Sequence, residues 1–233
     1  MKVEIWSDVM CPFCCIGKRK FEKALARFPH KEDIEIEWKS FQLNPDLKTD
    51  GSKNINDYLA EAKGISIEKA KEMNDYVTGI ANTVGLTYNF DKAVVANSFD
   101  AHRFSHLAKA KGLQDEAEEA LFKAYFTDGK NTSDHETLAE LGAAIGLDPE
   151  EIRKSLNSNE YAEEVKKDIY DAYQIGVRGV PFFVFDDKYA VSGAQESDTF
   201  LGALTQAYTE HVGKKPALNI VGEDGEYCTP ETC

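Results

Sequence analysis

Two cysteines separated by two residues are the feature of this sequence with the clearest chemical meaning. They lie in Cys11-Pro12-Phe13-Cys14, where a segment with helical periodicity begins. Unsatisfied backbone N–H groups and the positive end of the helix dipole at such a position favour a thiolate over a thiol. Pro12 fits the first helical turn, because the N–H that it lacks would have no partner there. We therefore predict that Cys11 is the exposed attacking sulfur and that Cys14, one turn later and facing inward, resolves a mixed disulfide.

The other cysteines are Cys15, Cys228 and Cys233. Five cysteines in 233 residues are too few for a disulfide scaffold, and their number is odd. We expect Cys15 to be a small buried apolar residue, because a third adjacent thiol has no clear place in a two-thiol exchange. Thr229-Pro230 favours a turn that could bring Cys228 and Cys233 within disulfide range. A second redox pair is our hypothesis for these two, with a static disulfide, idle thiols and metal binding as alternatives.

Metal binding is the other chemistry that these residue types could support. A structural zinc site needs a second CxxC or a nearby histidine pair, whereas the second thiol pair here has CxxxxC spacing at the far end of the chain. His102 and His106 have the i, i+4 spacing of a helical metal site, but no third histidine or carboxylate is placed with them. We therefore predict no metal ligands in this chain.

The elements that would position the dithiol follow from periodicity. Residues 2–6 alternate as a strand, residues 13–28 show helical spacing up to Pro29, and residues 34–41 alternate again. Strand, helix and strand in this order are the frame of a βαβ unit, with the dithiol at the first strand-to-helix junction. Lys39 and Gln42, at the end of the second strand, are interpreted as surface groups.

The rest of the chain divides into a helical block, a hairpin and a tail. Residues 54–176 predict five or six helices and no β pattern of comparable strength. A hairpin over residues 182–191 and a helix over 197–212 follow. The prediction is an α/β fold in which residues 1–53 and 177–212 form one domain around an inserted helical domain, residues 54–176. Residues 213–233 form a C-terminal tail that carries the CxxxxC motif.

Composition limits the classes of partner. Lys and Arg total 27 and Asp and Glu total 41, a net charge of −14. Nucleic acid and anionic membranes are therefore disfavoured as partners. Glu4 and Asp8 stand where a signal peptide would need its apolar core, so a cytoplasmic location is expected.

Several segments together strongly resemble the DsbA-like branch of the thioredoxin superfamily. They are the sequence from Ser7 to Cys14, the helical insertion, and the sequence Gly179-Val180-Pro181-Phe182-Phe183-Val184. The chain is most similar to the FrnE-like proteins, which are related to 2-hydroxychromene-2-carboxylate isomerases and kappa-class glutathione transferases. The resemblance extends over nearly all of residues 1–212.

The resemblance implies a thioredoxin-like fold and a set of site residues. Val180-Pro181 would be a cis peptide beside the active-site sulfur, and these two residues with Pro12 and Phe13 would form a substrate groove. Asn97 and His102 would face the active-site cleft.

The function implied is that of a protein thiol-disulfide oxidoreductase. Its partners would be proteins that carry thiols or disulfides and a redox recycling partner that the sequence does not identify; the oligomeric state stays open. No cofactor is required beyond the dithiol. The isomerase and transferase relatives typically have serine at the first cysteine position and bind glutathione, so the presence of both Cys11 and Cys14 favours exchange. The alternatives are a glutathione-dependent isomerase or transferase, with glutathione as co-substrate, and a zinc-holding or redox-sensing binding module.

Overall fold

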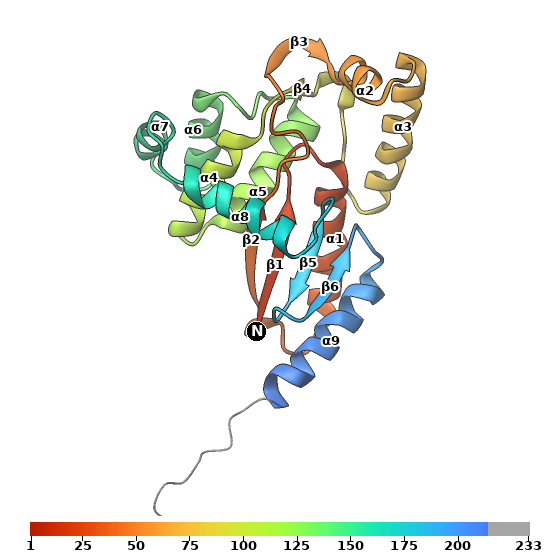
Figure 1. Ribbon diagram of the computed structural model, residues 1–233, viewed down its shortest axis with the longest axis vertical. Helices are drawn as coiled ribbons and strands as arrows, with labels where there is room; N and C mark the ends of the chain where they lie inside the picture. Colours follow the sequence, from red (N-terminus) through yellow and green to blue (C-terminus); the bar gives the residue numbers. More distant parts are fainter. Residues whose placement is uncertain (214–233) are drawn as a thin grey trace, which may run out of the picture.

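The computed structural model describes residues 1–213, whose centre is a four-stranded sheet (Figure 1). The strand order is β2-β1-β5-β6, with β1 parallel to β2 and antiparallel to β5. Central Ile5 lies opposite both Trp38 and Phe183. The bounds of the four strands are β1 (Lys2–Ser7), β2 (Glu35–Ser40), β5 (Phe182–Phe185) and β6 (Tyr189–Ser192). The mixed sheet and the helices around it confirm the predicted thioredoxin-like α/β fold.

Helices cover both faces of this sheet. On one face, α1 (Pro12–Arg27) and α9 (Ser197–Gly213) pack together, and Phe21 and Phe200 join Phe183 in an aromatic cluster with ring centroids 4.6–5.8 Å apart. The other face carries a smaller core that includes Trp6 and Ala172, the latter from α8 (Ala162–Gln174). The central strand β1 is buried on both faces, so its end is fixed where the dithiol begins.

The hairpin between β5 and β6 has the turn that its sequence favours. Asp186 and Asp187 both adopt positive φ, 51° and 54°. Two successive residues of this kind match the twist of a tight hairpin, and aspartate tolerates the conformation better than most residues. The hairpin therefore returns the chain to α9 beside α1.

The insertion joins β2 to β5 and forms the upper part of Figure 1. Side chains of Asn54, Ser66, Asp134 and Asp148 cap four of its helices by accepting N–H bonds from the first turn. Its helices are α2 (Ile55–Lys63), α3 (Ile67–Thr83), α4 (Phe99–Ala110), α5 (Gln114–Phe122), α6 (His135–Ala144), α7 (Pro149–Leu156) and α8. A π-helix (Lys123–Asp128) extends α5, and short 3₁₀ helices span Lys31–Asp33 and Phe90–Lys92.

One sequence expectation about this region is wrong. It contains seven α-helices, where five or six were predicted, because short capped segments such as α7 form separate helices. The structure also has a two-stranded antiparallel sheet that the sequence pattern did not indicate, which joins β3 (Asp50–Asn54) to β4 (Val94–Val95). The pattern missed it because β4 has only two residues and β3 contains no β-branched or aromatic residue.

Within residues 1–213, no helix combines the length and the apolar character that a bilayer span requires.

Candidate active site

The dithiol lies at the start of α1, directly after β1 ends. Cys11 is the N-cap residue, with an extended backbone, and Pro12 is the first helical residue. The Cys11 N–H donates to the Asp8 carbonyl over 2.9 Å, which closes the turn between strand and helix. Cys14 lies in the first helical turn and is 0% exposed.

Cys11 is less accessible than the sequence suggested. Only 5% of its surface is exposed, so the expectation of an exposed attacking sulfur is wrong for this conformation. The physical reason is the segment before β5, because the Cys11 thiol donates to the Val180 carbonyl over 3.4 Å. Phe13, between the two cysteines, is the exposed residue of the motif, at 38%.

Val180 and Pro181 form the wall that faces Cys11. Their peptide bond is cis, as the family resemblance implied. Pro181 is buried and lies against α1 at Gly17, where a Cβ atom would come within 2.9 Å of the Pro181 Cγ. The absence of a side chain at Gly17 therefore allows α1 to approach this segment closely.

The two thiols of the motif differ in environment. Burial raises the pKa of Cys14 well above its ordinary value, and the neighbouring Cys11 sulfur adds to the rise. The Ser7 hydroxyl and the backbone of Asp8 act in the opposite direction. Because burial is the largest of these influences, Cys14 is a protonated, protected thiol at neutral pH.

Cys15 is buried, as expected, at 2% exposure. Burial raises its pKa to about 11, against the influence of a hydrogen bond with Tyr88. Tyr88 comes from the loop after α3, and its hydroxyl also donates to the Pro12 carbonyl over 2.7 Å. Tyr88 was not among the predicted site residues, because nothing in its local sequence pattern distinguishes it from an ordinary core aromatic residue.

A buried acid and histidine lie behind the turn that precedes Cys11. Asp8 is 0% exposed and accepts the Leu43 N–H over 2.7 Å. His102, on α4, has its Nε2 atom 2.9 Å from the Phe41 carbonyl and 3.7 Å from Asp8 Oδ1. Burial acts to lower the pKa of His102, but hydrogen bonding and charge from Asp8 outweigh it and raise that pKa. The pair ties the helical insertion to the loop before the dithiol.

Asp8 was missed as a site residue, although its position offers a signal. It is a carboxylate between a buried strand and a CxxC motif, where an isolated charge needs a partner. His102 is that partner: its ring lies behind the turn that precedes Cys11 and contacts Asp8 and the Phe41 carbonyl.

Asn97 takes part in a different set of contacts. Its amide nitrogen donates to the carbonyls of Pro45 and Leu47, at 3.2 and 2.8 Å, and its carbonyl accepts from Gln42 over 3.0 Å. It fixes the loop that follows β2. Gln42 is only 6% exposed, so its interpretation as a surface group is wrong.

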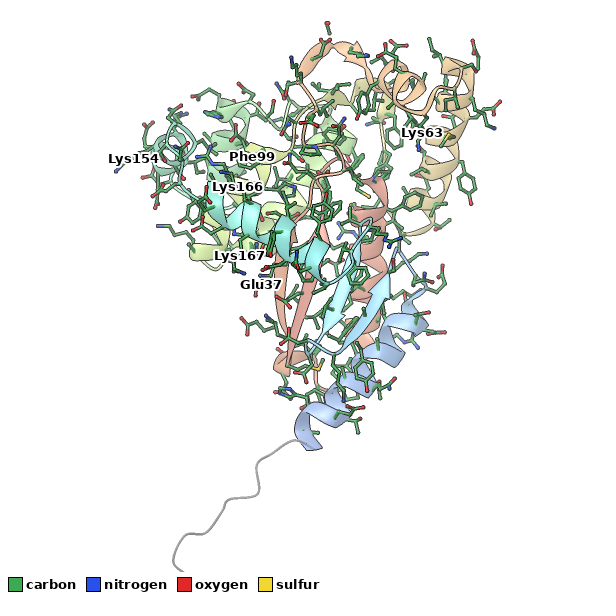
Figure 2. All side chains as sticks on the ribbon, in the orientation of Figure 1. Glu37, Lys63, Phe99, Lys154, Lys166 and Lys167 are labelled. Atoms are coloured by element: carbon green, nitrogen blue, oxygen red, sulfur yellow. The ribbon has the colours of Figure 1, made fainter. Side chains whose placement is uncertain are left out.

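Lys39 was also interpreted as a surface group, and its side chain is only 13% exposed. It forms ion pairs with Asp168 on α8, at 3.3 Å, and with Glu37 on its own strand, at 2.6 Å. Of these residues, Glu37 is labelled in Figure 2. Asp168 also lies 3.0 Å from His106 Nε2. Burial raises the pKa of Asp168, but His106, the Ser40 N–H and Lys39 outweigh it and lower that pKa. The network anchors α8, the helix that leads to Val180, to the sheet.

Among residues 1–213, no group of three histidine, cysteine, aspartate or glutamate side chains is arranged to hold a metal ion. His102 and His106 have separate carboxylate partners, Asp8 and Asp168. Cys228 and Cys233 lie outside the described residues.

The sheet order and the helical insertion define a thioredoxin-like protein. The profile of the DSBA-like thioredoxin domain matches residues 2–205, and the chain belongs to this family. A probable DsbA oxidoreductase from Streptomyces coelicolor is 40% identical and superimposes with a TM-score of 0.86, over 100% of this chain and 98% of that one.

More distant structures share the fold. 2-Hydroxychromene-2-carboxylate isomerase is 16% identical with a TM-score of 0.65, and the cytosolic disulfide reductase DsbM from Pseudomonas aeruginosa is 15% identical with a TM-score of 0.61. Each comparison covers 91% of this chain and 98% of the other. Membership of this family supports an enzyme role.

Proposed function

We propose that this protein is a thiol-disulfide oxidoreductase that uses the Cys11–Cys14 dithiol. The observation that carries the proposal is the difference between the two thiols. Cys11 is the N-cap of α1 and lies at the Val180 carbonyl, whereas Cys14 is fully buried behind it with a raised pKa. A nucleophile at a helix N-terminus followed by a protected thiol is the arrangement that two-step exchange requires.

The reaction begins when the Cys11 thiolate attacks a substrate disulfide. A bond forms between Cys11 Sγ and one substrate sulfur, and the other substrate sulfur leaves as a thiolate. Cys14 then loses its proton and attacks Cys11 Sγ, which releases the second substrate thiolate and leaves a Cys11–Cys14 disulfide. The substrate gains two electrons and the protein loses two; the reverse sequence oxidises a substrate dithiol.

Pro12, Phe13, Val180 and Pro181 would form the substrate groove around Cys11. Phe13 offers an exposed aromatic surface on one side, and the Val180 backbone offers a polar edge on the other. An extended polypeptide could pair with this edge while its sulfur meets Cys11.

No cofactor is required, because the dithiol itself carries the electrons. A thiol or disulfide partner must restore the starting state, and glutathione has the necessary chemistry. The likeness to a protein named a cytosolic disulfide reductase supports a cytoplasmic location. Cys228 and Cys233 remain the proposed second redox pair.

A glutathione-dependent isomerase or transferase is the alternative. The shared fold with 2-hydroxychromene-2-carboxylate isomerase favours it. In this case Cys11 would hold or activate a glutathione-type thiol, and Cys14 would not be needed.

A redox titration distinguishes the two functions. The protein is equilibrated in graded glutathione buffers, quenched with acid and alkylated, and its peptides are mapped by mass spectrometry. We expect Cys11 and Cys14 to oxidise together as one two-electron couple, while Cys15 stays reduced. Cys14→Ser should accumulate a mixed disulfide at Cys11, and Cys15→Ser should behave as the wild type. Glutathione on Cys11 without any Cys11–Cys14 disulfide would reject the oxidoreductase and favour the alternative.

A further inference from the structure

Tyr88 links the helical insertion to the centre of the CxxC motif. Its hydroxyl donates to the Pro12 carbonyl over 2.7 Å, and its side chain is buried, at 6% exposure. The ring stacks on Phe126 with centroids 4.6 Å apart and meets Phe90 edge-on at 5.6 Å. These contacts hold the phenol in one orientation, so the hydroxyl is aimed at a peptide group of the motif.

The phenol also lies among the sulfurs of the site. Burial raises the pKa of Tyr88 far above its ordinary value, and Cys15, Cys11 and Cys14 add to the rise. Tyr88 therefore keeps its proton under all physiological conditions and acts as a hydrogen-bond donor to Pro12.

The peptide group that accepts this bond has a second end, the N–H of Phe13. Phe13 is the second helical residue, and no acceptor for its N–H occurs within residues 1–213. The side chain of an N-cap residue is the usual acceptor for this N–H. In the structure, the Cys11 thiol instead gives its hydrogen to the Val180 carbonyl. Once that hydrogen is lost, the sulfur becomes an acceptor. The Cys14 thiol already lies beside it as one donor, and the Phe13 N–H is a second donor without another acceptor.

We propose that Tyr88 is a positioning residue that stabilises the Cys11 thiolate through the Pro12–Phe13 peptide group. A donor on the carbonyl polarises the peptide, and hydrogen bonds arranged in a chain strengthen one another. Tyr88 also fixes the plane of that peptide relative to Cys11. The inference rests on the proposed exchange function, because it concerns the stability of the nucleophilic form of the dithiol.

Tyr88→Phe removes the hydroxyl and keeps both ring contacts. Since the reduced thiolate form loses support, the equilibrium constant for oxidation of the dithiol by oxidised glutathione should rise about threefold. This change equals a midpoint potential about 14 mV more negative, at 29.6 mV for each tenfold change. Alkylation of Cys11 by iodoacetamide at pH 7 should slow by a similar factor. Tyr208→Phe is the matched control, because its hydroxyl bonds to Asp33, outside the dithiol site.

A variant that lacks the Cys15 thiol separates the contact of the Tyr88 hydroxyl with Pro12 from its contact with Cys15. Because Tyr88 also bonds to Cys15, the Tyr88→Phe change is repeated in a Cys15→Ala protein, where the same shift in potential is expected. Equal potentials for wild type and Tyr88→Phe would overturn the inference, as would a shift that vanishes without Cys15. A wild-type protein that never forms the Cys11–Cys14 disulfide would instead overturn the proposed function.

Discussion

The missing side chain of Gly17 sets the distance between helix α1 and the Val180-Pro181 segment. A Cβ atom there would lie 2.9 Å from Pro181 Cγ, closer than packed carbon atoms approach. We expect Gly17→Ala to lower the free energy of unfolding by about 1 kcal/mol, because overpacking costs roughly 1–3 kcal/mol and helix propensity returns about 1. Displacement of Pro181 should slow exchange with a disulfide substrate about tenfold.

Gly202 provides the control, because it also lies within a helix and a Cβ atom there meets nothing within 4 Å. Gly202→Ala should raise the free energy of unfolding by up to about 1 kcal/mol and leave exchange unchanged. Urea unfolding and stopped-flow kinetics measure both effects. Equal behaviour of the two variants would contradict the role given to Gly17.

The residues found from the sequence and those missed differ in a physical way. Cys11 and Cys14 lie in a short local motif whose chemistry is visible in the residue types, whereas the Val180-Pro181 pair was expected from the family resemblance. Tyr88 meets Pro12 across 76 positions of the chain, and such a contact exists only once the insertion has folded. The burial of Cys11 likewise depends on Val180, a residue far along the chain.

At the scale of elements, α4 is held against the loop before α1 by the pair of His102 and Asp8, and the strength of this contact depends on the protonation of His102. His102 has a raised pKa because Asp8 stabilises its charged form against the effect of burial. The unfolded value is about 6.5. The stability that this pair contributes is therefore fully present below about pH 6.5 and is lost as the pH rises through the folded pKa.

His102→Gln tests this linkage, because glutamine can still donate to the Phe41 carbonyl but carries no charge. We expect it to lower the free energy of unfolding by roughly 1–2 kcal/mol at pH 6 and by less at pH 9. The measurement is urea unfolding at both pH values. His30→Gln, an exposed histidine for comparison, should show no such difference, and a larger loss for His102→Gln at pH 9 would contradict the assignment.

Elements were predicted well where their periodicity is long and poorly where tertiary contacts create them. The strands of the central sheet and helices α1 and α9 have strong patterns, and their predicted positions agree with the structure within a few residues. The β3–β4 pair has no pattern of its own, since its strands exist by bonding to each other. Lys39 looked like a surface residue because its partner Asp168 lies on a distant helix.

At the scale of the whole molecule, the net charge of −14 should act on the rate of exchange with charged substrates. Oxidised glutathione is an anion, so repulsion slows its approach at low ionic strength. Between about 0.01 and 1 M salt the screening length falls from about 30 to 3 Å. The second-order rate constant should therefore rise about threefold over this range.

The uncharged 2-hydroxyethyl disulfide is the control substrate, and its rate constant should change little with salt. A rate constant for oxidised glutathione that falls with salt would contradict the prediction. That outcome would mean that a local cation, such as exposed Arg178 near Val180, outweighs the overall charge at the site.

Along the chain, the helical insertion begins after β2 and ends before β5. In the sheet, these two strands are the neighbours of β1. Recombination could therefore exchange the whole block without changing the strand that leads to the dithiol or the segment that faces it. Tyr88 makes such an exchange consequential, because the block supplies the hydroxyl that touches Pro12. Lineages that carry different insertions on the same sheet would inherit the same reaction with different redox potentials. Evolution could thus adjust how readily the dithiol is oxidised without altering a residue of the CxxC motif.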